Sequence, residues 1–160
     1  MTTYIWNLTF VPDQLSDRLQ HVILNAEHPT ETSALQTDGA WAGCYLFRPG
    51  DVIDVQTQIG NFEGFQTVTV HSLHLVCLPN IPIATNGLSP FDPSRSCISF
   101  ESDGGNSLQG NLTVPKTALD GAPYAGGWQV NGYLNLATNL IPRVLVFDPE
   151  VIVGSGTGED

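Results

Sequence analysis

Asp51-Val52-Ile53-Asp54-Val55-Gln56-Thr57-Gln58-Ile59 is the stretch that decides the fold class. Ile53, Val55, Thr57 and Ile59 alternate with Val52, Asp54, Gln56 and Gln58. Successive side chains of a β-strand point to opposite faces, so this period-two pattern predicts a strand with one face in the core and the other in water.

The flanking segments also have the residue patterns of strands and turns. Residues 41–47 are aromatic and apolar, and Arg48-Pro49-Gly50-Asp51 has turn chemistry, because Pro presets its own φ and Gly allows a positive φ. These segments predict strand, turn and strand. Residues 65–78 form a long β-rich run in which the apolar phase changes between Val70 and Leu73. We expect this run to be a central strand with a bulge or a buried second face.

Other segments add five strands and one helix. The further strands are expected at residues 4–11, 95–101, 108–114, 127–137 and 143–153, the last interrupted at Pro149, which makes about eight strands. Leu15, Leu19, Val22 and Ile23 follow a helical period after Pro12-Asp13 and predict a short N-terminal amphipathic helix. The expected fold is an all-β antiparallel sandwich, jelly-roll or immunoglobulin-like, formed by residues 1–153, with a flexible, glycine-rich acidic tail at 154–160.

Charge and composition restrict the partners. Sixteen Asp and Glu residues against five Lys and Arg leave a net charge of -11 over 160 residues. Such a surface repels phosphate backbones and anionic lipids, so we expect neither nucleic acid nor membrane as a partner. No stretch approaches the roughly 18 apolar residues of a membrane span, and residues 1–10 do not resemble a signal peptide. Three widely spaced cysteines are typical of reduced core residues, and the expected location is the cytoplasm.

No catalytic constellation stands out. His71 and His74 are three apart, an odd offset that sends the two side chains of a regular strand to opposite faces. Gly154-Ser155-Gly156-Thr157-Gly158 has no following chain for the helix that a nucleophile elbow needs. We therefore expect a protein that is not an enzyme and needs no cofactor, while a hydrolase with paired acids or a Ser–His contact stays open as a minor alternative.

Two loops rich in side-chain oxygen atoms suggest calcium as a ligand. Asp103-Gly104-Gly105-Asn106 brings a carboxylate and an amide together, and Asp148 lies near Glu150. Calcium takes six to eight oxygen ligands, so Asp103, Asn106, Asp148 and Glu150 are candidate calcium ligands. The first run is equally the chemistry of a hairpin turn, and that reading remains the commoner one.

Three segments also resemble the bacterial inclusion-body protein family, the AidA/PixA group. They are Pro49-Gly50-Asp51-Val52-Ile53-Asp54-Val55, residues 65–78, and Val146-Phe147-Asp148-Pro149-Glu150-Val151-Ile152-Val153. The resemblance implies a single β-rich domain in a soluble cytoplasmic protein of unsettled biochemical role, abundant enough in some members to form inclusions. It implies no catalytic residues.

Two functional hypotheses follow. The first is a non-enzymatic, self-associating accessory or inclusion-body-like protein, because the exposed edges of a sandwich can pair with a second copy into a homo-oligomer. The alternative is a lectin-like module, assisted by calcium or not, in which Trp41, Tyr124 and Trp128 stack on the sugar rings of a carbohydrate ligand. The usual fate of Trp in the core opposes this second hypothesis.

Overall fold

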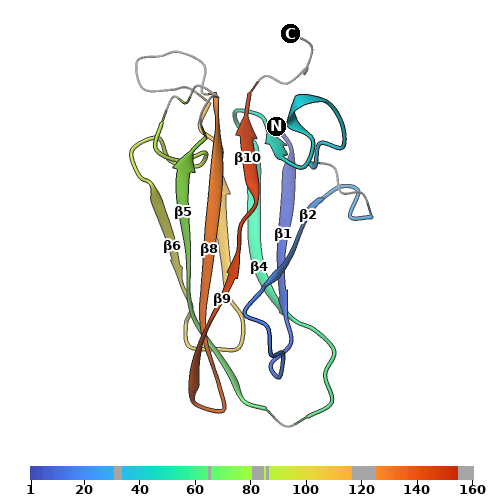
Figure 1. Cartoon of the computed structure of the whole chain (residues 1–160), viewed down its shortest axis with the longest axis vertical. Helices are drawn as coiled ribbons and strands as arrows, with labels where there is room; N and C mark the ends of the chain where they lie inside the picture. The colour runs from blue at the N-terminus through green and yellow to red at the C-terminus, as the bar shows by residue number, and fades with distance from the viewer. Residues whose placement is uncertain (31–33, 65, 81–84, 86, 117–124, 155–160) are drawn as a thin grey trace.

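A computed structural model describes residues 1–30, 34–64, 66–80, 85, 87–116 and 125–154, and these form two β-sheets that face each other (Figure 1). One sheet has four strands in the order β2-β1-β4-β7. Their bounds are Gln20–Asn25 for β2, Thr3–Phe10 for β1, Val52–Ile59 for β4 and Gln109–Thr113 for β7.

The other sheet has six strands. Five follow the order β3-β10-β8-β5-β6, and the sixth, β9, also pairs with β8. Their bounds are Tyr45–Phe47 for β3, Val68–Pro79 for β5, Cys97–Glu101 for β6, Gly126–Thr138 for β8, Ile141–Phe147 for β9 and Glu150–Val153 for β10. A single 3-10 turn, η1, spans Gly39–Trp41.

Strand β8 is the centre of the larger sheet. Its C-terminal half pairs with β9, where Gly132 lies opposite Phe147, and its N-terminal half pairs with β10, where Gln129 lies opposite Glu150. Both pairings keep one register, so β9 and β10 run along β8 as a single line interrupted at Asp148 and Pro149. The break at Pro149 confirms the sequence prediction, because proline has no N–H to donate to a ladder.

One apolar layer lies between the sheets. It joins buried side chains of both sheets, namely Trp6, Leu8 and Phe10 of β1, Ile53 and Val55 of β4, Leu73 and Leu75 of β5, Trp128 and Leu134 of β8, and Phe147 of β9. Edge-to-face ring contacts cross the layer, with ring centroids 5.5 Å apart for Trp6 and Phe147 and 5.2 Å apart for Tyr4 and Phe47. The all-β sandwich expected from the sequence is confirmed at this level.

Several local predictions are also confirmed. Ile53, Val55 and Thr57 are buried along β4 while Asp54 and Gln58 are exposed. The turn before β4 closes with a hydrogen bond from Asp51 N to Arg48 O of 3.0 Å, and Gly50 has a φ of 94°. Strand β5 is central, between β8 and β6, and its register shifts between Val70 and Ser72, as the phase change in the sequence predicts.

The strand directions differ from the prediction. The sheets are mixed and not purely antiparallel, because β1 runs parallel to β4 and β3 runs parallel to β10. The described residues contain ten strands in place of about eight. One extra strand arises because Pro149 divides the last segment in two, and the other is β2, which replaces the expected helix.

The predicted N-terminal helix is wrong. Leu15 is fully exposed, whereas Leu19 and Ile23 are buried and Ile23 lies opposite Trp6 in the β1–β2 ladder. The β-branched residues Val22 and Ile23 fit a pleated strand, and pairing with β1 overrides the weak helical period. The described residues form no helix that is long and apolar enough to cross a membrane.

Residues 11–19 cross between the sheets in an irregular path fixed by polar contacts. The Gln14 side chain accepts from Val11 N and donates to the carbonyl of Arg18, and the guanidinium of Arg143 donates to the carbonyls of Pro12 and Gln14. Together with the backbone hydrogen bonds of Asp17 O and Leu19 N to Val146 of β9, these bonds satisfy backbone groups of a segment that lies outside the regular strands.

The contact between Phe147 and Gly132 leads to a stability prediction. A Cβ atom at Gly132 would overlap the ring of Phe147, which is almost completely buried and cannot turn away. We expect Gly132→Ala to lower the free energy of unfolding by about 1–3 kcal/mol or more, the usual cost of overpacking a core. Urea unfolding measures the change. Gly64→Ala is the control, because a Cβ there meets only ordinary van der Waals contact, and an equal loss in both variants would contradict the prediction.

Candidate functional site: the outer face and free edge of the four-stranded sheet

The aromatic residues of the lectin hypothesis do not form one exposed patch. Trp128 lies on the inner face of β8, is fully buried, and donates from Nε1 to the carbonyl of Gly87 at 3.4 Å. A sugar in solution cannot reach its ring. Trp41 is half-buried at the end of η1, and Tyr124 lies outside the described residues. The expectation of an exposed Trp128 is therefore wrong, because its place in the alternation of β8 faces the core.

The four candidate calcium ligands lie in two separate places. Asp103 and Asn106 are in the exposed turn between β6 and β7, where Asp103 Oδ1 accepts from Gly105 N at 3.2 Å. Asp148 pairs with Arg18 at 2.9 Å, and Glu150 Oε2 accepts from the Cys44 thiol at 3.3 Å. No group of three or more His, Cys, Asp or Glu side chains that could hold a metal ion is present in the part of the chain that the structure describes.

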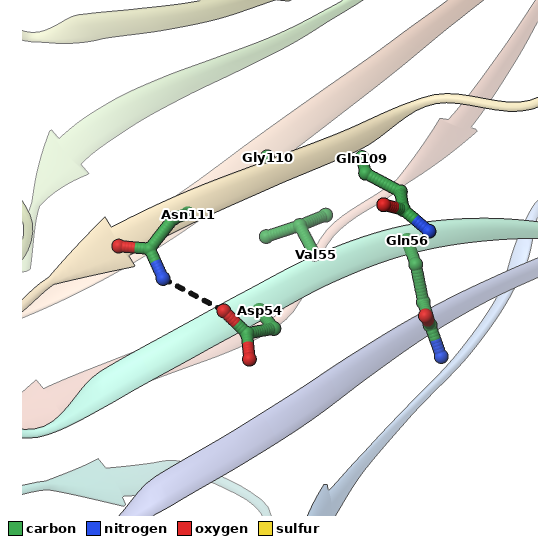
Figure 2. Close-up of a pocket in the computed structure, with 6 residues that line it drawn as sticks. All are labelled: Asp54, Val55, Gln56, Gln109, Gly110 and Asn111. Atoms are coloured by element: carbon green, nitrogen blue, oxygen red, sulfur yellow. Dashed lines mark hydrogen bonds between the residues drawn. The ribbon is translucent and has the colours of Figure 1, made fainter.

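The outer face of the four-stranded sheet carries an open depression. It has a volume of about 470 Å³ and is lined by residues of two neighbouring strands, β4 and β7, namely Asp54, Val55, Gln56, Gln109, Gly110 and Asn111. The antiparallel register places Asp54 opposite Asn111 and Gln56 opposite Gln109. Figure 2 shows Asn111 reaching toward Asp54 and Gln109 lying beside Gln56.

Hydrogen bonds orient these side chains. Asn111 Nδ2 donates to Asp54 Oδ1 at 2.7 Å, and Gln56 Nε2 donates to Asn7 Oδ1 of β1 at 2.6 Å. Each carboxamide has two donor hydrogens and an acceptor oxygen, and a carboxylate has two acceptor oxygens. One bond per pair leaves most of that capacity directed to solvent. The site can therefore offer fixed donors and acceptors to a polar ligand.

Strand β7 is also a free edge of the sheet. Val114 N donates to Asp51 O and Leu108 O accepts from Thr57 N, so these even-numbered residues point their backbone groups at β4. Because the direction alternates along a strand, the N–H and C=O groups of Gln109, Asn111 and Thr113 point the other way. They make no backbone hydrogen bond to any other residue that the structure describes.

A Ser–His contact, the feature required by the hydrolase alternative, lies on the outer face of the other sheet. Ser99 Oγ is 2.7 Å from His74 Nδ1, and Ser72 Oγ is 3.1 Å from His74 Nε2. Asn135 Nδ2 donates to Ser72 Oγ at 3.1 Å, so this chain of bonds ends in an amide. An amide has no negative charge to stabilise an imidazolium, which the third member of a Ser-His-Asp triad provides.

Two of the three thiols, Cys44 and Cys77, give no better nucleophile. Burial, followed by the nearby Glu150 carboxylate, raises the pKa of Cys44 to about 11, and burial raises the pKa of Cys77 to about 12. Thiols with such values stay protonated at neutral pH and are unreactive. The expectation that the cysteines are core residues is confirmed for Cys44 and Cys77. Cys97, by contrast, is exposed on β6.

The comparisons with known proteins stand beside this geometry. A scan with protein-family models gave no match, and a search of curated proteins found no similar protein. The resemblance to the inclusion-body family therefore stays a prediction.

Sequence reasoning missed the residues of the depression. The alternation at residues 51–59 placed Asp54 and Gln56 on a wet face, but the pairing of β4 with β7 decides that Gln109 and Asn111 join them. The available signal was a pair of carboxylate or amide side chains two residues apart in each segment, 54–56 and 109–111, which would line one face of any sheet that paired them.

A cluster of aromatic rings beside β2, away from the depression, contains a titratable group, the imidazole of His21. The imidazole of His21 on β2 lies against Phe147, Tyr45 and Trp6, with ring centroids 5.4, 6.0 and 6.3 Å apart. Its Nδ1 atom is buried without a hydrogen-bond partner among the described residues. Burial lowers the pKa of His21 below the ordinary 6.5, against a smaller opposing effect of Asp148.

This shift predicts a pH dependence. With a folded-state pKa below the unfolded value, the native state binds fewer protons, so stability is full above about pH 6.5 and falls as the pH drops toward the folded-state pKa. We expect His21→Phe to reduce the loss of stability between about pH 7.5 and about pH 5.5. Urea unfolding at both values measures it. His28→Gln, at an exposed histidine, is the control, and an unchanged pH slope in His21→Phe would contradict the assignment.

Proposed function

We propose that this protein is a non-enzymatic cytoplasmic accessory protein whose working property is reversible self-association, with strand β7 as the contact. The observation that carries the proposal is the chemistry of this edge. Its five residues, Gln109–Thr113, include no charged residue and no proline. Proteins usually protect exposed edges with Lys, Pro, bulges or a covering segment, and an edge without them is a template for pairing.

The other edges are better protected. The outer side of β3 is covered by residues 34–36, since Leu46 N donates to Ala34 O at 2.8 Å and Gln36 N donates to Cys44 O at 2.9 Å. Strand β2 is also uncharged, but the outward backbone groups at its two ends are used, since Leu19 N donates to Val146 O at 2.8 Å and Asn25 O accepts from His28 N at 3.1 Å. Strand β6 ends in the exposed carboxylate of Glu101. Among the described strands, β7 is the uncharged edge whose outward backbone groups, those of Gln109, Asn111 and Thr113, are all unpaired.

The geometry of β7 selects one symmetric register. Outward backbone groups belong to Gln109, Asn111 and Thr113, so an antiparallel pair centred on Asn111 places Asn111 opposite its own copy and Gln109 opposite Thr113. This pairing forms about six backbone hydrogen bonds, four between Gln109 and Thr113 and two between the Asn111 copies. Such a contact is isologous and closes on a two-fold axis.

The strength of this contact is limited. About six hydrogen bonds with a net value near 1 kcal/mol each are comparable with the cost of association, roughly 4–15 kcal/mol. The net charge of -11 on each copy opposes pairing further. We therefore expect association to be weak, with a dissociation constant on the order of millimolar or weaker, and to strengthen with salt as the repulsion is screened. Weak contacts of this kind suit a protein that assembles only where it is concentrated.

Paired charge substitutions test both the edge and the register. In Gln109→Lys with Thr113→Lys, like charges face each other across the two-fold axis, and we expect the dissociation constant to rise about tenfold or more. In Gln109→Glu with Thr113→Lys, opposite charges face each other, and association should equal or exceed that of the unmodified chain. Sedimentation velocity over a range of protein concentrations gives the constants.

These variants distinguish the β7 contact from changes in stability or in overall charge. Both positions are exposed, so both double variants should unfold at the same temperature as the unmodified chain. The double-lysine variant lowers the net negative charge, and its weaker association could not come from greater overall repulsion. A strict monomer at every concentration, or equal association of the two double variants, would overturn the proposal.

A further inference from the structure

We infer that the outer face of the four-stranded sheet is a binding site for a neutral carbohydrate, at the depression between β4 and β7. This site is distinct from the aromatic residues that the sequence suggested, and it does not depend on self-association. The inference rests on the charge of the face, on its hydrogen-bonding groups and on an apolar strip beside them.

The charge of the face excludes most other ligands. Strands β2, β1, β4 and β7 contain no Lys or Arg, and Asp54 is their only charged residue. Phosphorylated, sulfated and carboxylated ligands would meet a carboxylate with no cation to balance it, in a protein with a net charge of -11. A lone carboxylate beside amides also falls short of the oxygen ligands that calcium needs. A neutral ligand suits the face best.

The hydrogen-bonding groups match a row of hydroxyls. Asp54 and Asn111 are already joined at 2.7 Å, and so are Gln56 and Asn7 at 2.6 Å, which holds their remaining donors and acceptors in fixed directions. A hydroxyl both donates and accepts, so adjacent hydroxyls of a sugar can bind a carboxylate oxygen and an amide hydrogen together. Preorganised groups of this kind lose little entropy when a ligand binds.

The apolar strip lies on the same face, toward β1 and β2. The register places Ile5 between Asp54 and Leu24, and Asn7 between Gln56 and Val22. Ile5, Val22 and Leu24 are only partly buried, so their side chains remain accessible. A sugar ring has an apolar C–H surface as well as hydroxyl edges, and one face that offers aliphatic carbon beside carboxamides fits both.

The size and openness of the site set its affinity. A depression of about 470 Å³ falls within the range of small-ligand sites, roughly 300–1,000 Å³. It opens on a sheet face and buries only one side of a ligand. We therefore expect dissociation constants on the order of millimolar for short oligosaccharides.

The test is a titration of isotope-labelled protein with maltotetraose, cellotetraose and chitotetraose, followed by NMR of the backbone and side-chain amides. At least one neutral oligosaccharide should shift the side-chain signals of Asn111, Gln109 and Gln56 in a saturable manner, whereas a tetramer of galacturonic acid should not. Gln56→Met keeps the length of the side chain and removes its amide, and it should weaken binding about tenfold.

Gln129→Met, on the outer face of the other sheet, is the matched control and should bind as the unmodified chain does. No saturable shift with any of the three neutral sugars, shifts confined to other surfaces, or equal binding by Gln56→Met would each overturn the inference. Gln56 lies on β4, one strand away from the edge, so loss of sugar binding in this variant is distinguishable from loss of self-association, which the same samples report by sedimentation.

Discussion

The edge-to-face contact between Trp6 of β1 and Phe147 of β9 joins the two sheets, and it requires the absence of a side chain at Gly132. The ring centroids of Trp6 and Phe147 are 5.5 Å apart. A Cβ atom on Gly132 would overlap the Phe147 ring. Close packing allows no such overlap. Because β8 carries Gly132 and also pairs with β5, β9 and β10, the position of this ring fixes where the larger sheet sits against the smaller one.

Once these inner faces are buried against each other, the chemistry of the molecule is left to outer faces and edges. The four-stranded sheet is the more unusual surface, because an acidic chain has placed a single carboxylate, Asp54, on its four strands. The same sheet ends at the uncharged edge of β7. Pairing of two β7 strands would extend the sheet across the two-fold axis and bring two copies of the amide-lined face into one continuous surface. The two proposals therefore concern neighbouring parts of one sheet but different atoms, backbone groups for association and side chains for sugar.

Local pattern predicted well wherever one strand face is dry and the other is wet. The alternation of Ile53 and Val55 with Asp54 and Gln56, the turn at Gly50 and the bulge after Val70 all appear in the structure. The spacing of Leu15, Leu19 and Ile23 fits a helix, but the helix predicted from it is wrong. A helix there would bury Leu15, whereas the ladder with β1 buries Ile23, Leu19 is buried just before β2, and Leu15 stays in water. The helical spacing is present in the sequence, but pairing with β1, which lies outside this segment, selects the strand.

The sequence by itself determined the fold class and the strands other than β2, because side-chain alternation, turn residues and the break at Pro149 act over a few neighbouring positions. It also determined the acidic charge that disfavours anionic partners. Only the tertiary structure decided which strands became neighbours, and hence that Asp54 meets Asn111, that β1 runs parallel to β4, and that Trp128 faces the core. Strand pairing is set by long-range burial of the shared apolar layer, and an energy shared among residues far apart in the chain leaves no local mark of which strands will be neighbours.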